Sequence, residues 1–94
     1  MSRWRKKQMV IEAWQFMPAG RREELPPWID PRWFHEEIAS EVDRTVESAK
    51  PHMLIPTPGG ALRAELTDWI IRGVKGEVYP CKADVFAASY EPMR

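Results

Sequence analysis

Short runs of apolar residues, separated by turn-forming residues, dominate the pattern of this chain. β-Branched, aliphatic and aromatic residues are concentrated in these runs, and this composition is typical of strands. The runs predict strands over residues 9–16, 52–57, 61–66, 69–74 and 77–81.

The last two runs flank Lys75-Gly76, and this dipeptide predicts a tight β-hairpin. Its glycine can adopt the positive φ that a two-residue turn requires. Pro80 removes a backbone donor, so it should end the second strand or mark a sheet edge. The hairpin gathers cationic and aromatic groups without an evident catalytic set: Arg72, Lys75, Tyr79 and Lys82.

Between the first two runs the apolar residues take a helical spacing, at Trp28/Ile29, Trp33/Phe34 and Ile38. This spacing predicts one main helix over residues 26–40. Asp30 followed by Pro31 is a suitable pair for a helix N-cap and first turn. One helix bent near Pro31 and two short helical pieces both satisfy the pattern.

The chain ends in a second, shorter helical pattern. Asp84 can cap a helical turn in which Phe86 and Tyr90 lie four residues apart and share a face. Together these elements predict an α+β fold in a single domain, residues 1–94. We expect a curved, mainly antiparallel sheet of about five strands, one main helix and a short C-terminal helical turn.

Composition restricts the classes of protein that this chain can belong to. Its 94 residues are enough for one small domain, and five tryptophans supply apolar side chains for a core. One cysteine excludes an intrachain disulfide and a cysteine-based zinc site. We find no signal-peptide pattern, no run long enough to span a membrane and no motif for a cofactor, and we expect a soluble cytoplasmic protein.

The net charge is zero, but the charges are unevenly distributed. Residues 1–22 carry six basic groups and one acidic group, whereas residues 23–47 carry two basic and eight acidic groups. A nucleic-acid coat usually has a broader basic excess, so nucleic acid is not the expected partner. A local basic cluster that meets a phosphate or an acidic neighbour fits better.

Two regions supply candidate ligand-binding groups. Residues 1–7 form a basic arm, expected to be extended, in which Arg5, Lys6 and Lys7 could hold phosphates, although basic termini are also common solubilising segments. Arg72, Lys75 and Lys82 could continue this cationic patch or be ordinary solvated residues.

The remaining candidates are aromatic, acidic or sulfur-containing. Tyr79 could stack on a base, and Trp14 or Trp69 could line a groove, although a tryptophan is more often part of the core. Glu12 could pair with the basic arm or accept a hydrogen bond from a ligand. Lys82 could lower the pKa of the Cys81 thiol, but no base can be assigned beside it.

Several of these motifs resemble a widespread family of small phage and prophage proteins. The resemblance rests on Arg5-Lys6-Lys7, on Val10-Ile11-Glu12-Ala13, and on the run from Trp69 to Lys82. Family members typically end in a motif of the Trp-Ile-Ile-Lys-Gly-Val-Lys-Gly-Glu-Phe-Tyr-Pro-Cys-Lys-Pro-Asp type. The chain departs from this pattern at Thr67, where glycine is usual, and at Ala83, where proline is usual.

The resemblance implies a relation to phage "sponge" proteins that sequester the cyclic nucleotide or cyclic ADP-ribose signals of bacterial defence systems such as CBASS and Thoeris. We therefore expect a non-enzymatic protein of the bacterial host cytoplasm that captures such a nucleotide, with a homo-oligomer enlarging the site. The alternative is a phage protein-interaction module that binds a host or phage protein through exposed tryptophans. The implied ligand residues are Arg5, Lys6, Lys7, Glu12, Tyr79, Cys81 and Lys82.

Overall fold

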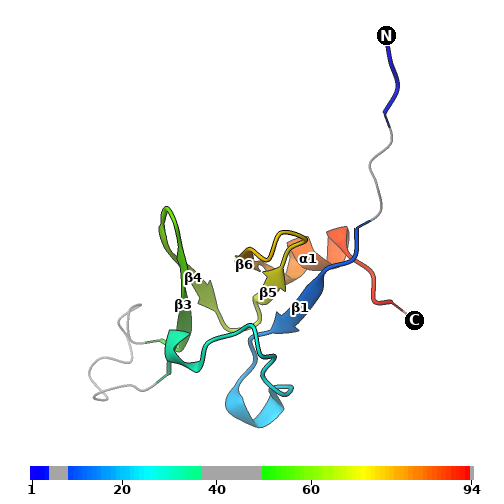
Figure 1. Ribbon diagram of the computed structural model, residues 1–94. Coiled ribbons are helices and arrows are strands. Elements are labelled where there is room, and N and C mark those ends of the chain that lie inside the picture. Colours follow the sequence, from blue (N-terminus) through cyan, green and yellow to red (C-terminus); the bar gives the residue numbers. More distant parts are fainter. Residues whose placement is uncertain (5–8, 37–49, 94) are drawn as a thin grey trace.

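The computed structural model describes residues 1–4, 9–36 and 50–93, which contain two small antiparallel sheets and one α-helix. One sheet has the order β1-β5-β6, from β1 (Glu12–Gln15), β5 (Trp69–Arg72) and β6 (Val78–Cys81). The other has the order β2-β3-β4, from β2 (Phe34–His35), β3 (His52–Thr57) and β4 (Gly60–Glu65). The helical elements are α1 (Ala83–Ser89) and two 3₁₀ turns, η1 (Ala19–Arg21) and η2 (Pro31–Trp33). Figure 1 shows their arrangement.

The strands thus divide between two sheets instead of forming the single curved sheet that we expected. The chain turns sharply between β4 and β5, where Thr67 has a φ of +77°. This corner separates the two sheets. The Thr67 amide donates to the Phe16 carbonyl (2.7 Å), and the Phe16 amide donates to the Asp68 carbonyl (2.9 Å). These bonds tie the corner to the end of β1, so that β5 pairs with β1 and β4 stays with β3.

The predicted main helix is wrong over its described part, residues 26–36. Asp30 does cap as expected, since its Oδ1 accepts from the Arg32 amide (2.8 Å), but only the three residues of η2 follow. Three prolines between residues 26 and 31 remove amide donors that a helix would need. Phe34 instead joins β2 and packs its ring edge-on against Trp14 (5.9 Å) and Phe16 (5.7 Å). Residues 37–40 of the prediction lie outside the described residues.

The predicted hairpin is confirmed, but its strands are shorter than predicted, and residues 73–77 connect them in place of a two-residue turn. β5 pairs with β6 in the register Trp69↔Cys81, and Gly76 has a φ of +84° in the turn. The C-terminal helix is also present as α1, and the Phe86 and Tyr90 rings lie 5.0 Å apart on its face. Asp84, however, lies in the first turn of the helix and makes no capping bond, because the N-cap residue is Lys82.

Seven side chains make up the buried core: Trp14, Phe16, Ile29, Met53, Ile55, Ala64 and Ile70. Because side chains alternate along a strand, Ile70 faces this core and Ile71 faces the opposite side of the sheet. Ile71 is fully buried there. The sheet β1-β5-β6 therefore has two apolar faces, one on the core and one on the side of α1.

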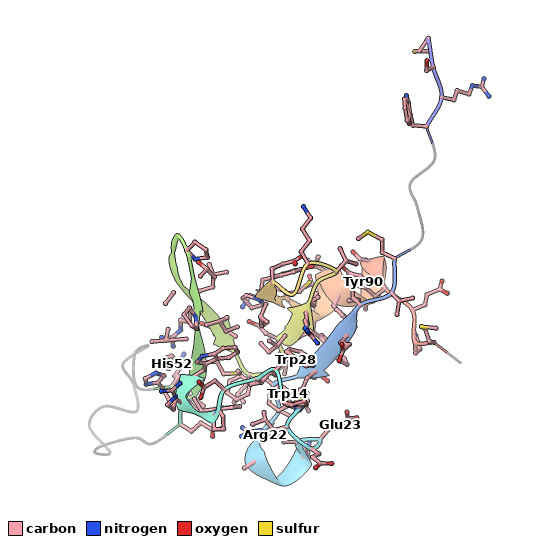
Figure 2. The ribbon with its side chains drawn as sticks, viewed as in Figure 1. Trp14, Arg22, Glu23, Trp28, His52 and Tyr90 are labelled. Atoms are coloured by element: carbon pink, nitrogen blue, oxygen red, sulfur yellow. The ribbon has the colours of Figure 1, made fainter. Side chains whose placement is uncertain are left out.

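Arg22 closes the aromatic end of the core. Its guanidinium carbon lies 4.9–5.8 Å from the ring centroids of Trp14, Phe16 and Phe34. It also donates to the Met17 carbonyl (3.0 Å) and forms an ion pair with Glu36. Figure 2 shows Arg22 and Trp14 next to each other, with Glu23, whose carbonyl accepts from the indole Nε1 of Trp14 (3.2 Å). This position makes Arg22 part of the packed structure.

Candidate functional site

Two of the predicted ligand-binding groups form an ion pair with each other. Arg72 Nη1 lies 3.3 Å from Glu12 Oε1, across the pairing of β1 with β5. Trp28 Nε1 donates to the other oxygen of Glu12 (3.1 Å). Glu12 thus has partners from two parts of the chain. The basic arm that we also considered, Arg5 to Lys7, lies outside the described residues. The pair is exposed, so a ligand phosphate could still compete for Arg72.

Lys82 also has a carboxylate partner. Its Nζ lies 3.1 Å from Asp68 Oδ2, and the Asp68 side chain is only 5% exposed. The same oxygen accepts from the Glu65 amide (2.9 Å). The hydrogen bond to Asp68 raises the pKa of Lys82. Lys82 therefore neutralises a buried charge at the corner between β4 and β5.

A small cleft lies beside the hairpin, with a volume of about 390 Å³. Its lining residues are Val10, Ile11, Glu12, Arg72, Gly73, Val74 and Gly76. Lys75 lies between two lining residues, and its amide donates to Glu77 Oε2 (3.0 Å). Of the predicted ligand residues that the structure describes, Glu12 and Arg72 line this cleft.

Tyr79 and Cys81 lie on β6 and are half-buried. Burial raises the pKa of Tyr79, and a side-chain hydrogen bond with Tyr90 raises it further. Burial also raises the pKa of Cys81, opposite to the lowering that we expected from Lys82. A raised pKa favours the thiol over the nucleophilic thiolate at neutral pH.

The tryptophans have different environments. Trp14 is 3% exposed, so its ring belongs to the core and is closed to a ligand. Trp69 is half-buried and stacks on Phe86 of α1, with ring centroids 4.3 Å apart and planes at 10°. Trp4 is fully exposed on the N-terminal segment 1–4, which extends away from the sheets (Figure 1). Arg5, Lys6 and Lys7 lie outside the described residues.

A larger groove runs between the start of β1 and α1. Its volume is about 1060 Å³. One wall carries Met9, Val10, Ile11 and Ala13, and the other carries Phe86, Ala87, Ser89 and Tyr90, followed by Glu91, Pro92 and Met93. Trp69 also lines the groove, and the rings of Trp69, Phe86 and Tyr90 stack in series there. Figure 2 shows Tyr90 beside α1.

Apolar side chains at the rim of this groove are left in water. Met9 is 57% exposed, Val10 68% and Met93 76%. Single exposed apolar side chains are ordinary, but a contiguous apolar surface marks an interaction site. Two sequence signals point to it: Trp69 as a residue that could line a groove, and the spacing of Phe86 and Tyr90, which places both rings on one side of α1.

No α-helix of the described residues is long and apolar enough to cross a bilayer. Among the same residues, no three His, Cys, Asp or Glu side chains are grouped in a way that could hold a metal ion.

Comparisons with family models, with curated proteins and with solved structures find no match to this chain. The resemblance to phage proteins therefore stays a prediction that rests on its motifs.

Proposed function

We propose that this protein is a non-enzymatic binding module, and that the groove between β1 and α1 holds an apolar segment of a partner protein. The observation that supports this most strongly is the series of stacked rings in the groove, bordered by three exposed apolar side chains. Aromatic side chains and methionine are enriched at protein interfaces, where they bury much area at a small cost in conformational entropy.

The charges at the groove indicate what the partner segment should carry. Glu91 lines the groove at the end of α1, and Asp84 lies exposed in the first turn of the same helix. The described part of α1 carries no basic residue in its last turn. A segment with apolar anchors and a neighbouring Lys or Arg would complement this wall.

The predicted cations supply less support for an anion site than the sequence alone suggested. Arg72 and Lys82 both have carboxylate partners, which lower the positive potential that a phosphate would meet. This is why the protein-interaction function ranks above nucleotide capture.

Affinity capture from a bacterial lysate, followed by titration with the purified partner, tests the proposal. Tyr90→Ala should weaken binding by about 30-fold, as expected for an aromatic anchor worth about 2 kcal/mol. Tyr90→Phe keeps the ring and controls for loss of the hydrogen bond to Tyr79. Leu62→Asp is a matched control, because Leu62 is exposed on β4, outside the groove. Equal affinity of Tyr90→Ala and wild type would contradict the proposal.

The second candidate is capture of a phosphate-bearing signalling nucleotide, and the cleft at the Glu12–Arg72 pair favours it. There a ligand phosphate could replace the Glu12 carboxylate on Arg72, while Glu12 turns to a ribose hydroxyl or a base amine. Titration calorimetry with cyclic dinucleotides, cyclic trinucleotides and cyclic ADP-ribose isomers tests this function. Binding that disappears in Arg72→Met would support it, and no heat with any of these ligands would remove it.

A further inference from the structure

The outer edge of β1 is open for pairing with another strand. β1 is the first strand in the order β1-β5-β6, and no other strand of the described residues pairs with that edge. The Phe16 amide and carbonyl both bond toward the β5 side. Because alternate residues of a strand direct their backbone groups to opposite edges, Ala13 and Gln15 direct theirs to the outer edge.

The other outer strands of the described residues, β6, β2 and β4, differ from β1 in composition, length or contacts. β6 carries Pro80 and contacts β3 and β4 of the second sheet. β2 is only two residues long, and β4 contacts β6. Natural proteins protect edges with charged side chains, proline, short strands or cover. β1 (Glu-Ala-Trp-Gln) is four residues long and carries one charge, Glu12, but neither proline nor lysine. The outer edge of β1 is therefore a candidate for pairing with another strand.

We infer that a second copy of this chain pairs with the edge, β1 against β1, around a two-fold axis at Ala13. A two-fold axis perpendicular to a sheet places an edge strand antiparallel to its own copy, so the same patch serves both subunits. In an antiparallel pair, residues directly opposite each other have side chains on the same face of the sheet. Side chains alternate between the faces along a strand, so the axis must pass beside one residue and its own copy, and not between two neighbouring residues.

The register follows from the side chains of β1. An axis at Glu12 would set two carboxylates directly opposite each other, which is unfavourable. An axis at Ala13 sets two small side chains opposite each other and places Glu12 opposite Trp14 of the second copy. It also pairs Ile11 with Gln15, so every residue of β1 gains a partner.

This dimer changes the groove as well as the sheet. Met9, Ile11 and Ala13 line the groove on the face that carries α1, and the two-fold axis keeps that face on the same side in both copies. The two grooves then lie side by side, bordered by the two α1 helices. The inference concerns the strand edge and stands independently of what the groove binds.

Charge-swap variants at the axis test the inference. Sedimentation equilibrium should give twice the chain mass of 11.0 kDa for the wild type. Ala13→Lys alone and Ala13→Glu alone should each weaken the dimer by about tenfold or more, since like charges then lie opposite each other. An equimolar mixture of the two should recover a dimer with one copy of each, which also proves that both variants fold.

Leu62→Lys and Leu62→Glu are the matched control pair. Alone or mixed, they should leave the mass from sedimentation equilibrium equal to that of the wild type. A wild type that stays monomeric at the highest soluble concentration would overturn the inference. So would a dimer that Ala13→Lys leaves intact, or single variants that stay monomeric when mixed. If the wild type is monomeric and the Tyr90→Ala variant still loses binding to the partner protein, the dimer is overturned and the proposed function stands.

Discussion

Thr67 carries strain that a single substitution should relieve. Among the described residues it is the one non-glycine residue with a positive φ, +77°, and it is β-branched. An L-residue in this region costs about 1–2 kcal/mol because Cβ approaches the following carbonyl oxygen. Glycine avoids that cost but loses about 0.5–1 kcal/mol more conformational entropy on folding. Thr67→Gly should therefore raise the free energy of unfolding by about 0.5–1 kcal/mol.

The corner keeps its hydrogen bonds in this variant because they use the backbone of residue 67. Its amide donates to Phe16, and its carbonyl accepts from Gln15 Nε2 (3.0 Å). For a domain of this size the gain corresponds to a rise in Tm of about 3–6 °C. The assay is thermal unfolding followed by circular dichroism, with urea titration as a second measure.

Two controls separate relief of strain from a general effect of glycine. Ala61→Gly, at an exposed position of β4, should lower the free energy of unfolding, because only the entropy cost applies there. Thr67→Ala removes the β-branch but keeps Cβ, so it should recover less stability than Thr67→Gly. A Tm for Thr67→Gly at or below that of the wild type would refute the reasoning.

Three further predictions concern Lys82, Cys81 and Arg22. Lys82→Met should lower the free energy of unfolding by about 1–2 kcal/mol in urea titrations, since the buried Asp68 loses its charged partner, whereas Lys75→Met at the exposed hairpin tip should change it little. The pKa of Lys82 is raised on folding, so the difference in free energy of unfolding between wild type and Lys82→Met should be complete below about pH 10.5 and should disappear as the pH rises further. A difference that persists in strong alkali would contradict the ion pair of Lys82 with Asp68. Cys81 should react with iodoacetamide at pH 8 more slowly in the folded protein than in urea, because its pKa is raised by burial, and faster reaction in the folded state would contradict this. Arg22→Met should lower Tm more than Arg21→Met, since only Arg22 contacts the aromatic core.

Features set by neighbouring residues could be predicted from the sequence. The hairpin follows from Lys75-Gly76, because the turn chemistry is contained in the turn itself. The Asp30 cap was also predicted correctly, but the helix beyond it was not. There the prolines and the packing of Phe34 on distant rings decide the structure, and periodicity of apolar residues reports neither.

The candidate site was harder to predict because its parts come from distant positions. Glu12 and Arg72 are 60 residues apart, and no local pattern indicates that each neutralises the other. The groove depends on Trp69 of β5 meeting Phe86 of α1, a contact between different elements. The sequence identified these residue types as candidates for binding, but their partners follow only from the fold.

Site-specific photocrosslinking tests the role of the groove most directly. A benzophenone side chain introduced at Met93, on the rim of the groove, is compared with the same group at Leu62, which is exposed outside it. After irradiation in cells, our account predicts one discrete protein adduct from position 93 and none from position 62. An adduct from position 62 alone, or none from position 93, would contradict the claim that the groove is the binding surface.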